Sequence, residues 1–158
     1  MSKIILGTVQ FGLDYGISNT FGKTPIEEVH RILDYAYYKG IITLDTASGY
    51  GNSEEIIGNY LTNNPLKKFE VITKIHSLDI SLEKQLKESL IRLKLEKVEV
   101  LMLHSFELYK NFKSQLSLFC RENKGKYFNE LGVSVYTNEE IEVINLDPII
   151  DRIQTPFN

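Results

Sequence analysis

The stretch that decides the fold reads FEVITKI at residues 69–75 and VEVLML at residues 98–103. Both segments are short and predominantly apolar, which is typical of strands buried on both faces of a parallel sheet. Between them a helical period begins near Ser81 and places four leucines on one face: Leu82, Leu86, Leu90 and Leu93. A strand, a helix and a second strand in this order predict a unit of two parallel strands joined by a crossover helix.

The same alternation extends towards the start of the chain. KIILGT at residues 3–8 predicts a buried strand, and a loop-like stretch follows over residues 10–23. Thr24-Pro25-Ile26-Glu27 combines a capping box with Pro at the first helical position, and the predicted helix ends at Gly40. Residues 41–44 predict a second strand. Asn52-Ser53-Glu54-Glu55 then predicts the start of a helix that reaches about Thr62.

It also extends towards the end of the chain. A less regular helical pattern covers about residues 112–123, and LGVSV at residues 131–135 predicts a fifth strand. Thr137 caps a fifth predicted helix, and IIDRIQT at residues 149–155 predicts a sixth strand. The sequence therefore predicts six strands that alternate with five helices.

This alternation indicates the α/β class, with a parallel sheet covered by helices. A doubly wound open sheet and a (β/α)8 barrel both fit. No G-x-G-x-x-G follows the first strand, and reactive residues instead follow several different strands, which favours the barrel. A full barrel takes about 250 residues. We therefore expect residues 1–158 to be a single domain, a TIM barrel truncated to about six units, which could associate with other copies through its open edges.

Composition restricts the partners. The formal net charge is −3 and no basic cluster is present, so a nucleic-acid partner is not expected. The apolar runs are far shorter than the roughly 20 residues that cross a bilayer. With one cysteine, Cys120, and no signal-peptide pattern in MSKIILGTVQFG, we expect a cytoplasmic protein.

Four residues with reactive side chains lie at or just after predicted strand ends: Asp45, Tyr50, Lys74 and His104. Each one alone is compatible with a structural or solvated role. The ends of parallel strands converge on one mouth, however, so together the four could form an acid–base site. A phenol donates a proton at neutral pH more readily when an ammonium lowers its pKa, and a carboxylate would hold that ammonium. His76 could line the same mouth. No metal site is expected, because the possible ligands are few.

Several short motifs around these residues resemble successive signatures of the aldo-keto reductase superfamily. They are Leu44-Asp45-Thr46-Ala47, Tyr50-Gly51-Asn52-Ser53-Glu54, Thr73-Lys74, Leu103-His104 and Leu131-Gly132-Val133-Ser134. The resemblance runs in order from Leu6-Gly7-Thr8 to Gln154-Thr155-Pro156-Phe157-Asn158. It implies a (β/α)8 barrel that transfers a hydride from a nicotinamide cofactor, usually NADPH with NADH not excluded, to an aldehyde or ketone.

The resemblance also implies a role for each matching residue. Tyr50 would be the general acid, Lys74 would lower its pKa, Asp45 would pair with Lys74, and His104 would orient the carbonyl. A second set would contact the cofactor: Gly7, Thr8, Ser134 and Gln154. Val135 follows Ser134 where the family often has Asn, so one carboxamide contact differs.

Two other functions stay open at this point. The residues that hold the cofactor phosphate in this family come from strands seven and eight, which lie beyond the predicted elements. A non-catalytic barrel fragment that pairs its edges with a partner is one alternative. A binding module that senses the nicotinamide is the other.

Overall fold

The computed structural model describes residues 4–156. One parallel sheet contains six strands in chain order, β1-β2-β3-β4-β5-β6. Their bounds are β1 Leu6–Gly7, β2 Thr43–Asp45, β3 Glu70–Ile75, β4 Val98–Leu103, β5 Phe128–Ser134 and β6 Arg152–Gln154. The sheet curls: the Gln154 side chain in β6 reaches Asp45 in β2 and hydrogen-bonds it, although these two strands are not neighbours in the sheet. The α/β class and the barrel architecture are therefore confirmed.

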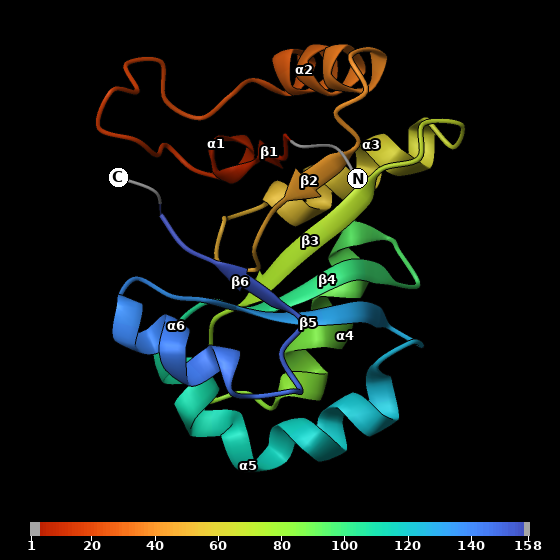
Figure 1. Ribbon diagram of the computed structural model, residues 1–158. Coiled ribbons are helices and arrows are strands. Elements are labelled where there is room, and N and C mark those ends of the chain that lie inside the picture. Colours follow the sequence, from red (N-terminus) through yellow and green to blue (C-terminus); the bar gives the residue numbers. More distant parts are fainter. Residues whose placement is uncertain (1–3, 157–158) are drawn as a thin grey trace.

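Helices connect the strands and cover the outside of the curl (Figure 1). Their bounds are α1 Val9–Gly12, α2 Ile26–Tyr38, α3 Ser53–Asn63, α4 Leu82–Leu93, α5 Phe106–Asn123 and α6 Asn138–Asn145. Gly40, the glycine predicted to end this helix, follows α2 and has a left-handed φ of 75°.

Two helices differ from the sequence-based expectation. The short α1 lies in a stretch predicted as loop, since four residues are too few to show a helical period. Helix α5 starts at Phe106 rather than near residue 112. The Ser105 side chain accepts a hydrogen bond from the Leu108 amide at 3.2 Å, which caps the earlier start. The predicted first strand also began at Lys3, which lies outside the described residues, and β1 itself covers only Leu6–Gly7.

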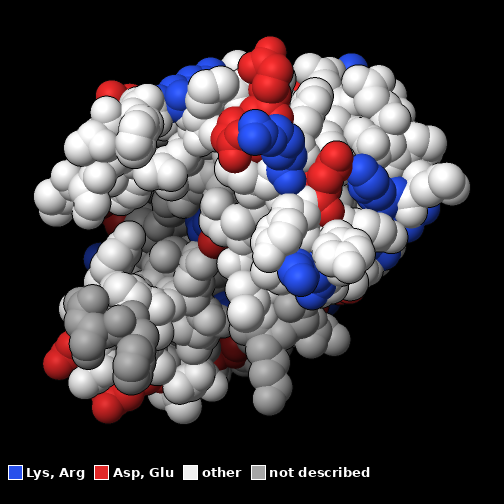
Figure 2. Space-filling view, turned by 90° about the horizontal axis from the view of Figure 1, so that it is seen from above, with Lys and Arg blue, Asp and Glu red and all other residues white. Residues whose placement is uncertain are grey.

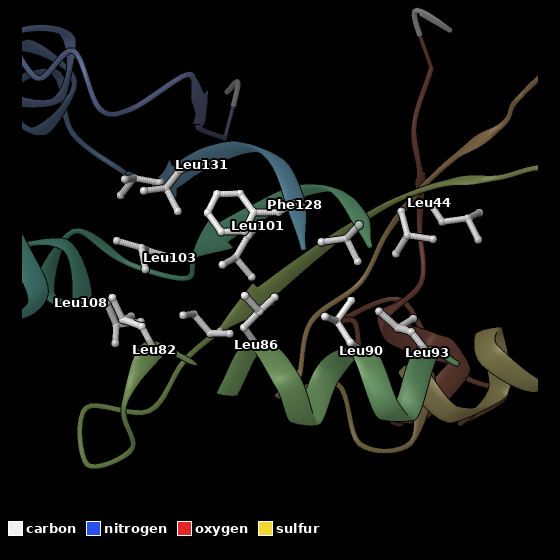
Figure 3. Close-up of a cluster of buried hydrophobic side chains, with 14 of the residues drawn as sticks. Leu44, Leu82, Leu86, Leu90, Leu93, Leu101, Leu103, Leu108, Phe128 and Leu131 are labelled. Carbon is white, nitrogen blue, oxygen red and sulfur yellow. The ribbon is translucent and has the colours of Figure 1, made fainter. Parts of the chain in front are cut away.

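The core lies between the sheet and its helices. Figure 3 shows the α4 leucines pointing towards side chains that the strands direct outwards. The labelled members of this cluster are Leu44, Leu82, Leu86, Leu90, Leu93, Leu101, Leu103, Leu108, Phe128 and Leu131. Full burial of each large apolar side chain contributes about 1.5–3 kcal/mol. This packing fixes the strands against the helices and so holds the strand ends at defined positions.

The face of the molecule drawn in Figure 2 shows no concentration of one charge. On the face seen in Figure 2, Lys and Arg lie beside Asp and Glu rather than in separate patches. Within residues 4–156, no helix combines the length and the apolar character needed to cross a membrane.

Candidate active site

A pocket opens at the carboxyl ends of the strands. It is lined by Asp45, Tyr50, Lys74, His104, Ser134, Tyr136, Gln154, Thr155 and Pro156. Four of these residues lie in β2, β3, β5 and β6, and His104 directly follows β4. They share one pocket because parallel strands present their carboxyl ends at one edge of a sheet. The structure thus brings Asp45, Tyr50, Lys74 and His104 together.

Asp45 and Lys74 form a buried ion pair at the floor of the pocket. Only 3% of the Lys74 side chain and 15% of the Asp45 side chain are exposed. Lys74 Nζ donates to Asp45 Oδ1, and Gln154 Nε2 donates to Asp45 Oδ2 at 2.7 Å. Because both carboxylate oxygens have a donor, the cost of burying the two charges is offset locally.

Tyr50 lies between this ion pair and His104. Lys74 Nζ is 5.3 Å from the centre of the Tyr50 ring. The Tyr50 and His104 rings meet edge to face, with centroids 5.9 Å apart. The loop that carries Tyr50 packs closely on α1, where a Cβ on Gly12 would lie only 1.7 Å from the Tyr50 carbonyl oxygen. A side chain at position 12 would therefore displace this loop.

The pKa of Tyr50 is raised to about 12, first by burial and then by the negative charge of Asp45. The net direction is opposite to the lowering that the sequence suggested. Lys74 is paired with Asp45 at close range, so burial of the phenol and the Asp45 charge outweigh the effect of the ammonium on the Tyr50 pKa. Tyr50 consequently keeps its proton at neutral pH and can donate it.

The His104 imidazole is neutral at physiological pH. Its pKa is lowered from the usual 6.5, chiefly by burial and then by the charges of Lys74 and His76. Its backbone amide donates to the Ile75 carbonyl at 3.0 Å, which ties the residue to the end of β3. A neutral imidazole at this position can donate one hydrogen bond and accept another.

The predicted cofactor contacts divide into two groups. Ser134 and Gln154 line the pocket, and within residues 4–156 the Ser134 hydroxyl has no hydrogen-bond partner. Gly7 and Thr8 do not line it. Thr8 is fully buried, and its hydroxyl donates to the Asp45 carbonyl at 2.9 Å. At Gly7 a Cβ would meet nothing within 4 Å, so open space lies beside the end of β1.

Sequence reasoning missed three residues that line the pocket: Tyr136, Thr155 and Pro156. Position gave a usable signal for all three, since Tyr136 lies two residues after Ser134 and the other two directly follow β6. Tyr136 is 67% exposed and, with Tyr15, also raises the pKa of Tyr50.

Other features of the described residues do not suggest a competing site. A second cavity lies deeper in the curl, where Ile72, Met102 and Arg152 are among the lining residues. Its arginine is paired with Glu130. Among residues 4–156 there is no group of three or more His, Cys, Asp or Glu side chains that could hold a metal ion.

Comparison with known proteins gives matches over nearly the whole chain. A family model described as the aldo/keto reductase family matches residues 3–155. Versiconal hemiacetal acetate reductase of Aspergillus parasiticus is 30% identical over 161 residues, which cover 98% of this chain and 38% of that protein.

Solved structures agree on the fold. A putative aldo-keto reductase from Pseudomonas aeruginosa aligns with a TM-score of 0.75 and 24% identity, over 98% of this chain and 62% of that one. An aldo-keto reductase of Bombyx mori in complex with NADP aligns with a TM-score of 0.69 and 20% identity, over 98% and 54% of the two chains. The chain thus spans less than two thirds of the length of each of these relatives.

Proposed function

Because this chain belongs to the aldo/keto reductase family, we propose that its protein is an oxidoreductase that reduces a small aldehyde or ketone by hydride transfer from NADPH or NADH. The observation that carries the proposal is the shared pocket, in which Tyr50 lies between the Asp45–Lys74 ion pair and the neutral His104. A positioned proton donor beside a hydrogen-bonding imidazole is what reduction of a carbonyl requires of the protein.

Tyr50 acts as the general acid in this mechanism. Its raised pKa keeps the phenol protonated at neutral pH, and the phenol passes its proton to the carbonyl oxygen as negative charge develops there. A phenolate remains on Tyr50 after this step. The ammonium of Lys74, 5.3 Å from the ring centre, stabilises that phenolate, while Asp45 holds Lys74 in place.

His104 orients the substrate. A neutral imidazole donates a hydrogen bond to the carbonyl oxygen without competing with Tyr50 for its proton. Its edge-to-face contact with the Tyr50 ring keeps the two groups on the same side of the pocket.

The nicotinamide cofactor would supply the hydride. Ser134 and Gln154 fit its carboxamide, since the Ser134 hydroxyl is unpartnered within residues 4–156 and both side chains line the pocket. Gly7 and the backbone of Thr8 would border the same ligand from the end of β1, where space is open at Gly7, whereas the Thr8 side chain is buried away from the pocket. We assign residues 1–158 to a single domain, the N-terminal portion of the barrel, and place the protein in the cytoplasm.

A second candidate function follows from the outer strands. Within the described sheet, β1 and β6 each pair with one neighbour only, and Ile5 beside β1 is 46% exposed. Strand edges of this kind pair readily with another chain. A chain of this length could therefore act by associating with a further copy or with a partner.

The test of the reductase is oxidation of NADPH and NADH, followed by absorbance, with a panel of aldehydes and ketones and the protein at its natural length. We expect oxidation that depends on the carbonyl compound and falls sharply in Tyr50→Phe. Equal rates in the wild type and in Tyr50→Phe would contradict the assignment of Tyr50. Absence of any oxidation, together with absence of cofactor binding, would favour the second candidate.

A further inference from the structure

Five buried polar side chains form two hydrogen-bonded groups around the first turn of α3, outside the pocket. They are Thr8, Thr46, Ser53, Glu54 and Thr73, and each is at most 1% exposed. We call these five residues the α3 latch, because Ser53 and Glu54 begin α3, Thr8 and Thr46 directly follow β1 and β2, and Thr73 lies within β3. None of them lines the pocket of Tyr50.

Ser53 joins α3 to the first two strands. Its hydroxyl accepts from Thr46 Oγ1 at 3.1 Å and donates to the Thr8 carbonyl at 3.0 Å. The Thr8 hydroxyl in turn donates to the Asp45 carbonyl at 2.9 Å. Each hydroxyl donates one bond to the next group, so the chain of hydrogen bonds is complete.

Glu54 joins α3 to the third strand and to α4. The Thr73 hydroxyl donates to Glu54 Oε1, and Arg92 Nε donates to Glu54 Oε2 at 2.7 Å. The carboxylate is buried with both oxygens paired, and Arg92 also reaches Ser89 Oγ at 3.2 Å. Glu54 is therefore fixed in one orientation.

Two latch residues are direct neighbours of pocket residues along the chain. Thr46 follows Asp45 and Thr73 precedes Lys74, so alternation along a strand sends the threonines outwards and the charged pair into the pocket. The Ser53 amide donates to the Tyr50 carbonyl at 3.0 Å. The first turn of α3 is thus hydrogen-bonded to the Tyr50 carbonyl and to the neighbours of Asp45 and Lys74 in the chain.

We propose that Ser53 and Glu54 are positioning residues, which hold the Tyr50 loop at a fixed distance from the Asp45–Lys74 pair through the α3 latch. This role rests on the proposed reductase function. A buried ionised group is a weak source of stability, since apolar residues of similar volume often replace buried pairs without loss. A fully paired buried network does, however, restrict its members to one geometry.

The test removes one hydroxyl without changing shape. Thr73→Val keeps the volume of Thr73 but cannot donate to Glu54, whereas Thr73→Ser keeps the hydroxyl. We expect Thr73→Val to lower kcat about 10- to 100-fold with little change in the KM for cofactor, because small misplacements of catalytic groups have effects of this size. Thr73→Ser should restore most of the loss.

A matched control separates positioning from stability. Val98→Ala also removes buried volume, but at the start of β4, away from the strand ends that form the pocket. It should lower thermal stability at least as much as Thr73→Val and leave kcat near the wild-type value. The proposal is overturned if Thr73→Val and Val98→Ala lose kcat equally, or if Thr73→Ser fails to restore it.

A second readout does not depend on catalysis. The Ser48 amide donates to the Lys74 carbonyl at 2.9 Å and reports how the Tyr50 loop is held against β3. Amide hydrogen exchange over residues 46–53 should be at least tenfold faster in Thr73→Val than in Thr73→Ser or Val98→Ala. Unchanged exchange would refute the latch. Faster exchange in a protein that reduces no carbonyl would instead refute the proposed function and retain the latch.

Discussion

At the scale of single residues, the Tyr50 phenol is the group whose chemistry the pocket controls most directly. It is flanked by a buried ion pair and a neutral imidazole, and its pKa is about 12 because burial disfavours the phenolate. The phenol therefore stays protonated throughout the physiological range, and only a developing negative charge beside it would draw the proton away.

Replacing Tyr50 by Phe tests this directly. The change removes the hydroxyl alone, so we expect turnover to fall by about 10²–10⁴, the usual contribution of a general acid, with cofactor affinity nearly unchanged. Steady-state kinetics and a cofactor fluorescence titration give the two values. A variant with full turnover would show that Tyr50 is not the acid.

His104 gives a prediction about pH. Its pKa lies below 6.5 in the folded chain because burial and the nearby Lys74 disfavour the imidazolium. On acidification His104 therefore takes up its proton at a higher pH in the unfolded chain than in the folded chain. The contribution of His104 to the free energy of unfolding is present above pH 6.5 and is lost as the pH falls through the pKa of His104 in the folded chain.

Nuclear magnetic resonance titration of the histidine side chains should give a midpoint below 6.5 for the signal that disappears in His104→Gln. The same variant should show a weaker loss of unfolding free energy below pH 6.5 than the wild type. A midpoint above 6.5 would contradict the burial argument.

At the scale of elements, the contact between α3 and α4 depends on a glycine. A Cβ on Gly58 would lie 2.4 Å from the Arg92 carbonyl oxygen and 2.7 Å from the Leu93 carbonyl carbon. Backbone atoms of a helix cannot move aside cheaply, so any side chain here pushes the two helices apart.

Gly58→Ala should therefore destabilise the protein by about 1–3 kcal/mol through overpacking, although alanine favours helix by about 1 kcal/mol. Asn59→Ala is the matched control, since Asn59 is exposed on the same helix and the change should be neutral or slightly stabilising. Urea unfolding measures both. Equal stability of the two variants would mean that the helices do not approach this closely.

The cap of α5 is a second element-scale prediction. Ser105→Ala removes the side chain that accepts from the Leu108 amide, and we expect a loss of about 1 kcal/mol. Ser114→Ala, at an exposed position within the same helix, should change stability by less than about 0.5 kcal/mol. Similar losses in both variants would argue against a cap at Ser105.

At the scale of the whole molecule, the outer strands of the sheet give a prediction about residues 1–158 prepared alone. A chain of residues 1–158 prepared alone would present β1 and β6 with one unpaired edge each. We expect it to associate and to bind NADPH weakly, and sedimentation with a cofactor titration tests both. A monomer that binds NADPH at micromolar concentration would contradict this expectation.

A charge at the β1 edge should weaken that association. Ile5→Lys places an ammonium beside β1, where Ile5 is 46% exposed. Ile17→Lys is the control, because Ile17 is fully exposed in the loop after α1 and lies outside the sheet. If both variants associate as the wild type does, the contact does not involve the β1 edge.

The sequence by itself determined the order of strands and helices, the α/β class and the group of residues that share the pocket. Strand and helix periods are local, so β4 matches its predicted bounds and α4 begins beside the predicted Ser81. The rule that parallel strands present their carboxyl ends at one edge then sufficed to group Asp45, Tyr50, Lys74 and His104.

Only the tertiary structure decided how the environment acts on those residues. The hydrogen bond from Gln154 to Asp45 joins positions 109 residues apart, and it depends on the curl of the sheet rather than on any local pattern. The raised pKa of Tyr50 has the same origin, because burial and the charge of Asp45 together set its direction. Burial and pairing are sums over the whole fold, and a one-dimensional pattern does not contain them.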